Sequence, residues 1–119
     1  MLVKLAVLFS GNGSNLQNLL EKLHRKRFGN NEFEVVLCLC NNKNAYGIER
    51  ARKFKLESVI IEHKNFACRE DFDRALVSEI QKSGADLAVL AGFMRILSPV
   101  FTQNVRAINL HPSLLPLFK

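Results

Sequence analysis

This chain of 119 residues lacks several features that mark other classes of protein. No stretch comes near the ~20 consecutive apolar residues that span a bilayer, and no low-complexity tract, linker or internal repeat divides the chain. The apolar start, residues 1–9, is short and leads into Ser-Gly-Asn-Gly, where a signal peptide would carry a small-residue cleavage site. These absences favour a buried first strand over a leader. We expect one globular domain, soluble and cytoplasmic, with no membrane partner.

Cysteine is scarce as well. Three cysteines, an odd number, argue against a disulfide framework. Cys38 and Cys40 lie two apart in an expected strand, so both should face one side as small buried side chains. A metal site would need further ligands at suitable spacing, and the sequence offers none, so we expect no metal.

Acidic residues are outnumbered: 17 Lys and Arg against 11 Asp and Glu give a net charge of +6. The excess is spread along the chain, with one cluster at residues 24–27 that we place in the last turn of an expected helix, where cations favour the helix dipole. This pattern favours a solvated helix end over a nucleic-acid patch. We expect His24 and His63 to face solvent. The basicity suits an anionic small-molecule substrate without selecting one.

Strand and helix patterns alternate along the whole chain. Apolar runs predict strands at residues 4–9, 33–39, 58–61, 87–91 and 106–110. Periodic segments predict helices starting at Ser14 (with a capping box to Gln17, and Gly29 as terminator) and spanning 46–54, 69–83 and 99–104. The fold class is therefore α/β, a doubly wound and mostly parallel sheet. Ligands of such sheets bind beyond the carboxyl ends of the strands, so the loops at 10–15, 92–97 and after Asn109 should converge.

The first of these loops, residues 10–15, reads Ser-Gly-Asn-Gly-Ser-Asn. Its two glycines let the backbone approach a ligand closely, and helix-terminal N–H groups with Ser and Asn side chains suit an anion. The loop is neither a dinucleotide fingerprint nor a Walker loop, because Leu16 stands where a third glycine would be and no Gly-Lys-Ser follows. A phosphate site and a plain tight turn both remain open.

The second loop follows the strand expected at residues 87–91. Gly92 permits a sharp exit, and Phe93, Met94, Ile96 and Leu97 supply an apolar wall. Such a wall with backbone polar groups is the usual lining for a flat heteroaromatic ligand. Ordinary core beneath a loop is an equal alternative on spacing alone.

The third segment places Asn109 and His111 two residues apart at the end of an apolar run. Residues at i and i+2 of a strand point to the same face. A hydrogen-bond donor beside a group that titrates near neutrality suits acyl-type transfer, in which an oxyanion forms and a proton moves. A capped or core histidine is the alternative.

Five blocks of sequence carry a resemblance to a known family. They are residues 10–16 (SGNGSNL), 47–51 (GIERA), 69–70 with 73–76 (RE, DRAL), 91–99 (AGFMRILSP) and 109–116 (NLHPSLLP). On these blocks the chain resembles the amino-terminal part of the folate-dependent glycinamide ribonucleotide transformylases, or phosphoribosylglycinamide formyltransferases, over nearly its whole length. The resemblance implies a Rossmann-like formyltransferase topology.

The resemblance also implies a reaction: transfer of a formyl group from 10-formyltetrahydrofolate, the cosubstrate, to the amine of glycinamide ribonucleotide in purine synthesis. It implies that Asn109 hydrogen-bonds the oxyanion and that His111 moves the proton as the catalytic acid. It also implies that the substrate phosphate is held by Gly13, Ser14 and Asn15, and that Gly92 lies near the ribose or glycinamide part. The folate contacts that it implies are made by Arg69, Met94, Arg95, Ile96 and Leu97.

The family pattern continues past Pro116 into a loop whose aspartate pairs with the catalytic histidine, and into strands that close the folate pocket. We therefore expect residues 1–119 to form a single, incomplete amino-terminal domain, truncated at its carboxyl end and poorly active alone. A related folate formyltransferase, a formyl-folate hydrolase, and for this piece a phosphate-binding module without turnover all remain open. The oligomeric state is not specified by the sequence.

Overall fold

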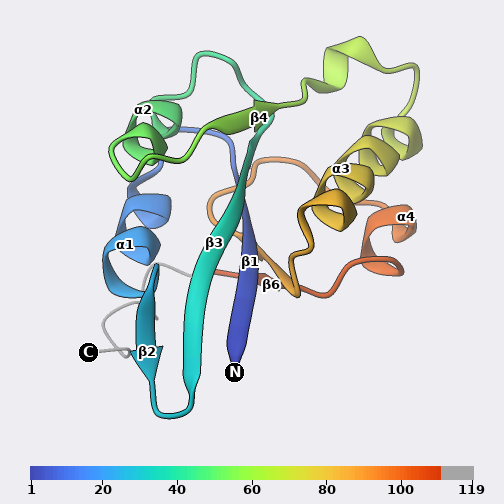
Figure 1. Ribbon diagram of the computed structural model, residues 1–119. Coiled ribbons are helices and arrows are strands. Elements are labelled where there is room, and N and C mark those ends of the chain that lie inside the picture. The colour runs from blue at the N-terminus through green and yellow to red at the C-terminus, as the bar shows by residue number, and fades with distance from the viewer. Residues whose placement is uncertain (111–119) are drawn as a thin grey trace.

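The computed structural model describes residues 1–110, which form one sheet with helices on both faces (Figure 1). In chain order the elements are β1 (Leu2–Phe9), α1 (Ser14–Lys22), β2 (Lys26–Phe28), β3 (Asn31–Cys40), α2 (Gly47–Arg52), β4 (Ser58–Ile60), a 3₁₀ turn η1 (His63–Asn65), α3 (Arg69–Ser83), β5 (Leu87–Leu90), α4 (Pro99–Thr102) and β6 (Ala107–Asn109). The expected alternation of strand and helix is confirmed.

The sheet has the order β2-β3-β1-β5-β6, with β4 also paired to β3. Every pairing is parallel except that of β2 with β3. The chain moves outward from β1 to β3 and β4, then crosses back to β5 on the other side of β1. The strand order thus reverses between β1 and β5, which confirms the doubly wound, Rossmann-like fold and marks the ligand position that such sheets favour.

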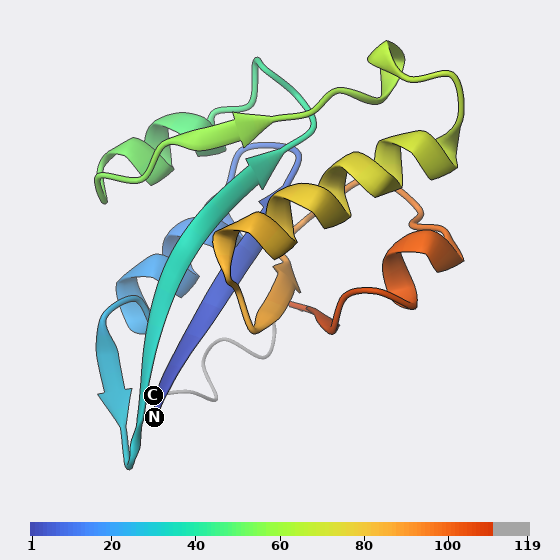
Figure 2. The same cartoon turned by 45° about the vertical axis from the view of Figure 1, so that its right-hand side comes forward.

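The two faces of the sheet carry separate cores, one beneath each of the two pairs of helices that lie on either side of the sheet in Figure 2. Alternate residues of β1 divide between them: Leu5, Val7 and Phe9 pack with α1 and α2, whereas Ala6 and Leu8 pack with α3 and α4. A strand buried on both faces needs an apolar side chain at every position, which explains the continuous apolar run. Within residues 1–110 no helix has the length and hydrophobicity needed to cross a membrane.

The cysteine prediction is confirmed for β3. Cys38 and Cys40 are both buried and belong to the core beneath α1 and α2. Burial raises the pKa of the Cys38 thiol to about 12, so this thiol stays protonated at neutral pH. Among the described residues, no three His, Cys, Asp or Glu side chains gather closely enough to hold a metal ion.

The basic cluster at 24–27 does not end a helix, so that prediction is wrong. Helix α1 stops at Lys22, and Lys26–Phe28 forms a short strand antiparallel to the start of β3 through a turn at Gly29, whose φ is +64°. Pairing with β3, including the bond from Arg25 N–H to the Phe33 carbonyl (2.7 Å), outweighs the weak helical periodicity there. The capping box is also absent, because Gly13 is the N-cap and it has no side chain.

His24 does not face solvent either, because its side chain fills a gap in the edge of the sheet. One side of β3 pairs with β2 at residues 31–33 and with β4 at residues 38–40, leaving Val35 between them. The Val35 N–H donates to Nδ1 of His24 at 2.9 Å, and His24 is only 8% exposed. The imidazole therefore replaces a strand partner, and must be neutral at Nδ1 to accept this bond.

This contact predicts a loss of stability in mild acid. Burial first, and then the Arg25 charge, hold the pKa of His24 below its ordinary value, against a smaller opposing effect of Glu34. Because the pKa of His24 is lower in the folded state, the stability that the neutral imidazole contributes is complete above about pH 6.5, the pKa in the unfolded chain. This contribution is lost as the pH falls through the folded-state pKa. Urea unfolding at pH 8 and pH 5 should show a smaller free energy of unfolding at pH 5.

The matched variant is His24→Asn, whose amide oxygen can accept the Val35 bond and does not titrate. Its free energy of unfolding should change less between the two pH values than that of the parent chain. An equal change in both chains would contradict this role for His24.

Candidate functional site

Two loops meet at the point where the strand order reverses. The hydroxyl of Ser10, directly after β1, accepts the Met94 N–H, after β5, at 2.7 Å, and Ser10 is buried. The end of β6 lies alongside, since the Leu110 N–H bonds to the Leu90 carbonyl at 2.9 Å. The expected convergence of the loops after β1 and β5 is confirmed. Sequence reasoning gave Ser10 no role, because nothing in its spacing pointed to a partner 84 residues away.

The loop after β1 is shaped for close approach of a ligand to backbone. Gly13 has a φ of +80° and precedes α1 as its N-cap, and a Cβ on Gly13 would lie 2.5 Å from the Cα of Gly47. The Ser14 N–H donates to the Asn12 side chain at 3.0 Å, which fixes the turn. The first turn of α1 holds no acidic residue, so the positive end of its dipole is uncompensated. This is the environment that an anion prefers.

Arg50 on α2 holds this loop from outside. Its Nε donates to the Asn12 carbonyl at 2.7 Å, a second nitrogen donates to the Gln17 side chain, and the guanidinium lies over the Tyr46 ring at 5.1 Å. The arginine therefore brings a fixed positive charge beside the turn. Sequence reasoning used the Gly-Ile-Glu-Arg-Ala block for the resemblance but missed this role.

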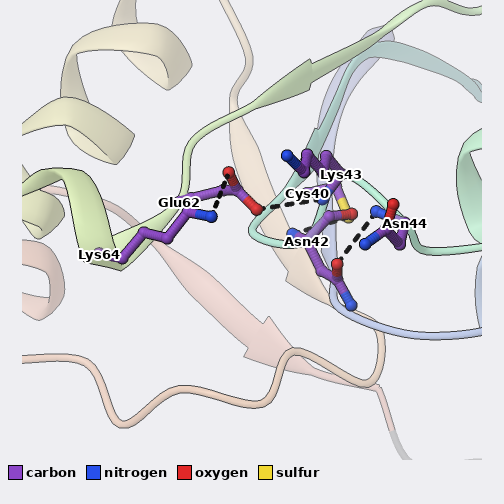
Figure 3. A network of polar contacts seen from close by, with 6 residues as sticks. All are labelled: Cys40, Asn42, Lys43, Asn44, Glu62 and Lys64. Carbon is purple, nitrogen blue, oxygen red and sulfur yellow. Dashed lines mark hydrogen bonds and ion pairs between the residues drawn. The ribbon is translucent and has the colours of Figure 1, made fainter.

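The loop after β3 is ordered by its own polar groups and by Glu62, which follows β4 (Figure 3). Burial raises the pKa of the Cys40 thiol, which stays protonated and donates to the Asn42 carbonyl at 3.2 Å. The Asn42 side chain accepts the Asn44 N–H at 3.0 Å. The Glu62 carboxylate accepts the Lys43 N–H at 3.4 Å and forms an ion pair with Lys64 at 3.8 Å. These bonds hold the start of α2, where the Gly47 N–H meets the Gly11 carbonyl at 3.1 Å.

The loop after β5 presents apolar side chains on its outer side. Gly92 turns the chain with a φ of +74°, and Met94 and Ile96 are each 78% exposed. Phe93 and Leu97 point the other way and pack against the core beneath α3 and α4. Phe93 and Leu97 thus fit the core alternative, whereas Met94 and Ile96 form an exposed apolar wall whose use by a ligand stays a prediction.

The two arginines assigned to this region differ in placement. The Arg95 guanidinium lies over the Phe72 ring of α3, 5.6 Å from its centre. Arg69 is exposed at the first residue of α3 and stands one helical turn before Phe72. Residues at i and i+3 lie on the same face of a helix. Arg69 therefore lies on the α3 face that carries Phe72, the residue over which Arg95 of the loop lies.

Asn109 closes β6 beside the same loops. Its Cα partner across the sheet is Leu90, the last residue of β5, and Asn109 is exposed. His111 lies outside the described residues, so its expected pairing with Asn109 stays a prediction.

The sequence model of the formyl transferase family matches residues 3–119. The chain belongs to the formyl transferase family.

Individual relatives show which members of the formyl transferase family the chain is similar to. The chain is 42% identical over 118 residues to the trifunctional purine biosynthetic protein adenosine-3 of Chironomus tentans, and 40% identical over 116 residues to phosphoribosylglycinamide formyltransferase of Escherichia coli (strain K12). It is also similar to the crystal structure of phosphoribosylglycinamide formyltransferase from Campylobacter jejuni subsp. jejuni NCTC 11168, with a TM-score of 0.92 and 71% identity.

These alignments cover 98%, 96% and 100% of this chain, but 8%, 53% and 63% of the respective relatives. The chain thus spans about half the length of the Escherichia coli enzyme and less than two thirds of the Campylobacter one.

Proposed function

We propose that the protein carrying this chain transfers a formyl group from 10-formyltetrahydrofolate to the amine of glycinamide ribonucleotide, a step of purine synthesis. The observation that carries the proposal is the Ser10–Met94 bond, which sets an anion-binding loop and an exposed apolar loop side by side at the switch point of the sheet. The names of the relatives supply the substrate. The proposal involves two small-molecule reactants and invokes no metal, nucleic acid or membrane, and we place the reaction in the cytoplasm.

The loop after β1 would hold the substrate phosphate. Gly13 gives the close approach, Ser14 and Asn15 begin α1 at its positive end, and Arg50 adds a positive charge beside the turn. Gly92, across the Ser10–Met94 bond, would lie by the ribose or glycinamide part.

The loop after β5 fits the folate. Met94 and Ile96 offer exposed apolar surface to a flat ring, and we expect backbone groups of residues 95–97 to bond the ring edge. The Met94 N–H is taken by Ser10 and is not among these groups. Arg69 is exposed and can reach an acidic part of the cosubstrate. Arg95 is expected to contribute its backbone, because its side chain packs on Phe72.

The chemistry needs two side chains at the end of β6. The amine attacks the formyl carbon, and the Asn109 amide donates a hydrogen bond to the formyl oxygen as negative charge develops there. As the new C–N bond forms, the amine loses one proton. His111 delivers a proton to the folate nitrogen as the bond from the formyl carbon to that nitrogen breaks, so no net proton is consumed. The Asn109 position beside the last residue of β5 puts the donor within the same group of loops.

The test is a formyl-transfer assay on the protein in its full natural length. With both reactants present, formylated glycinamide ribonucleotide and tetrahydrofolate should appear in equal amounts, followed by mass spectrometry. Omitting the ribonucleotide should leave formate release at background. Formate release without it would identify a hydrolase, formylation of methionyl-tRNA a related transferase, and binding without any product a phosphate-binding module; each would refute the proposal.

A further inference from the structure

Helix α3 buries a carboxylate that the proposed chemistry does not use. Asp73 is 0% exposed and lies among the apolar side chains that α3 turns toward the sheet, including Phe72 and Leu76. Placing a charge in such surroundings is costly unless hydrogen bonds compensate it. The contacts of Asp73 therefore indicate what it does.

Both bonds of this carboxylate go to one residue at the end of the β5–α4 loop. Oδ2 of Asp73 accepts the Ser98 N–H at 2.6 Å and the Ser98 hydroxyl at 2.5 Å. Ser98 is 3% exposed and is the N-cap of α4. Hydrogen bonds to a carboxylate are roughly twice as strong as neutral ones, so this is a firm attachment of the loop to α3.

The loop is thus fastened at two points by side chains from other elements. Near its start the Met94 N–H is held by Ser10, and at its end Ser98 is held by Asp73. The exposed Ile96 lies between these two points. Arg95, also between them, stacks its guanidinium on Phe72, the residue before Asp73, and so brings positive charge to the same turn of α3.

We infer that Asp73 is a positioning residue for the formyl donor: through Ser98 it holds the loop at residues 92–98 in the conformation that receives the flat ring. This inference rests on the proposed function, and Asp73 itself touches no ligand. Its effect should fall mainly on the formyl donor, because Ser98 lies at the other end of the loop from Gly92 and the Ser10–Met94 bond. The phosphate loop is also held by Arg50 and by the start of α2.

The test substitutes Asp73→Asn in the protein at its full natural length and measures both Michaelis constants. The variant keeps the shape, and its amide oxygen can take the place of Oδ2, which accepts both bonds, so the change removes the charge. The KM for 10-formyltetrahydrofolate should rise about tenfold, the scale by which a charge-assisted hydrogen bond exceeds a neutral one, with the KM for glycinamide ribonucleotide changed by less than about twofold. Ser98→Ala, which loses only the hydroxyl bond, should give a smaller rise in the same constant.

Ile80→Val is the matched control. Ile80 is buried on the same face of α3 but does not contact the loop through a polar group. It should lower the melting temperature without changing the KM for the formyl donor. Equal rises of both constants in Asp73→Asn, or a rise in Ile80→Val of the same size, would mean that Asp73 acts only through stability and would overturn the inference.

Amide hydrogen exchange separates this inference from the proposed function, because it needs no substrate. Exchange at residues 92–98 should be faster in Asp73→Asn and Ser98→Ala than in the parent, with exchange at residues 11–15 unchanged. Unchanged exchange at 92–98 overturns the positioning role even if formyl transfer is found. A parent protein that transfers no formyl group refutes the proposed function whatever the exchange shows.

Discussion

Asn109→Ala is expected to lower kcat for formyl transfer by about 10²–10³, because it removes the donor that meets the developing oxyanion. Such a loss corresponds to about 2.7–4 kcal/mol of transition-state stabilisation. Asn109 is exposed at the end of β6, so the free energy of unfolding should barely change. The measurement is steady-state formyl transfer beside urea unfolding, both on the protein in its full natural length.

Asn104→Ala is the matched control for this prediction. Asn104 precedes β6, at the opposite end of the strand from the proposed site, and within residues 1–110 its side chain donates to the Val100 carbonyl at 2.7 Å. The same change of residue type there should leave kcat unaltered. A kcat for Asn109→Ala close to that of Asn104→Ala would exclude Asn109 as the oxyanion donor.

Gly13→Ala should weaken binding of the phosphorylated substrate and also destabilise the fold. The new Cβ would lie 2.5 Å from the Gly47 Cα, so the loop and the start of α2 would have to move apart. A backbone φ of +80° adds strain for any residue with a Cβ, and together the two effects should cost about 2–4 kcal/mol of stability. The KM for glycinamide ribonucleotide should rise at least about tenfold, as for the loss of one or more hydrogen bonds to the phosphate.

Gly29→Ala is the control that separates backbone strain from the steric clash with Gly47. Gly29 also has a positive φ, +64°, but a Cβ there would meet nothing within 4 Å, and it lies in the β2–β3 turn. This variant should cost about 1 kcal/mol of stability through backbone strain alone and leave both Michaelis constants unchanged. If Gly13→Ala behaves like Gly29→Ala, the contact between the two loops does not shape the phosphate site.

The parts of the fold that the sequence predicted well are those in which one periodicity runs unbroken. The apolar run of β1 and the whole of α3, with Gly84 as its C-cap in the left-handed conformation, match the structure. The prediction that residues 24–27 form the last turn of a helix was wrong. The structure of this segment depends on pairing with β3, a contact that local periodicity does not encode.

The local geometry of the candidate site was predictable at its glycines and less so where it depends on hydrogen bonds between residues far apart in the sequence. Gly13 and Gly92 are recognisable because each adopts a conformation that favours glycine. Asp73 was missed, although it stands with Leu76, Val77 and Ile80 at the spacing of a buried helix face, and a charged residue there was a usable signal. The roles of Ser10 and Arg50 depend on partners brought together only by the fold.

The divided edge of β3 has a consequence for self-association. A long open strand edge would offer its row of N–H and C=O groups to another chain, which is how sheets begin to aggregate. Here β2 and β4 each cover one stretch of that edge, and His24 occupies the Val35 N–H between them. On this side of the sheet the outer strand β2 is only three residues long and carries Lys26 and Arg27, so like charges would repel a second copy approaching along it.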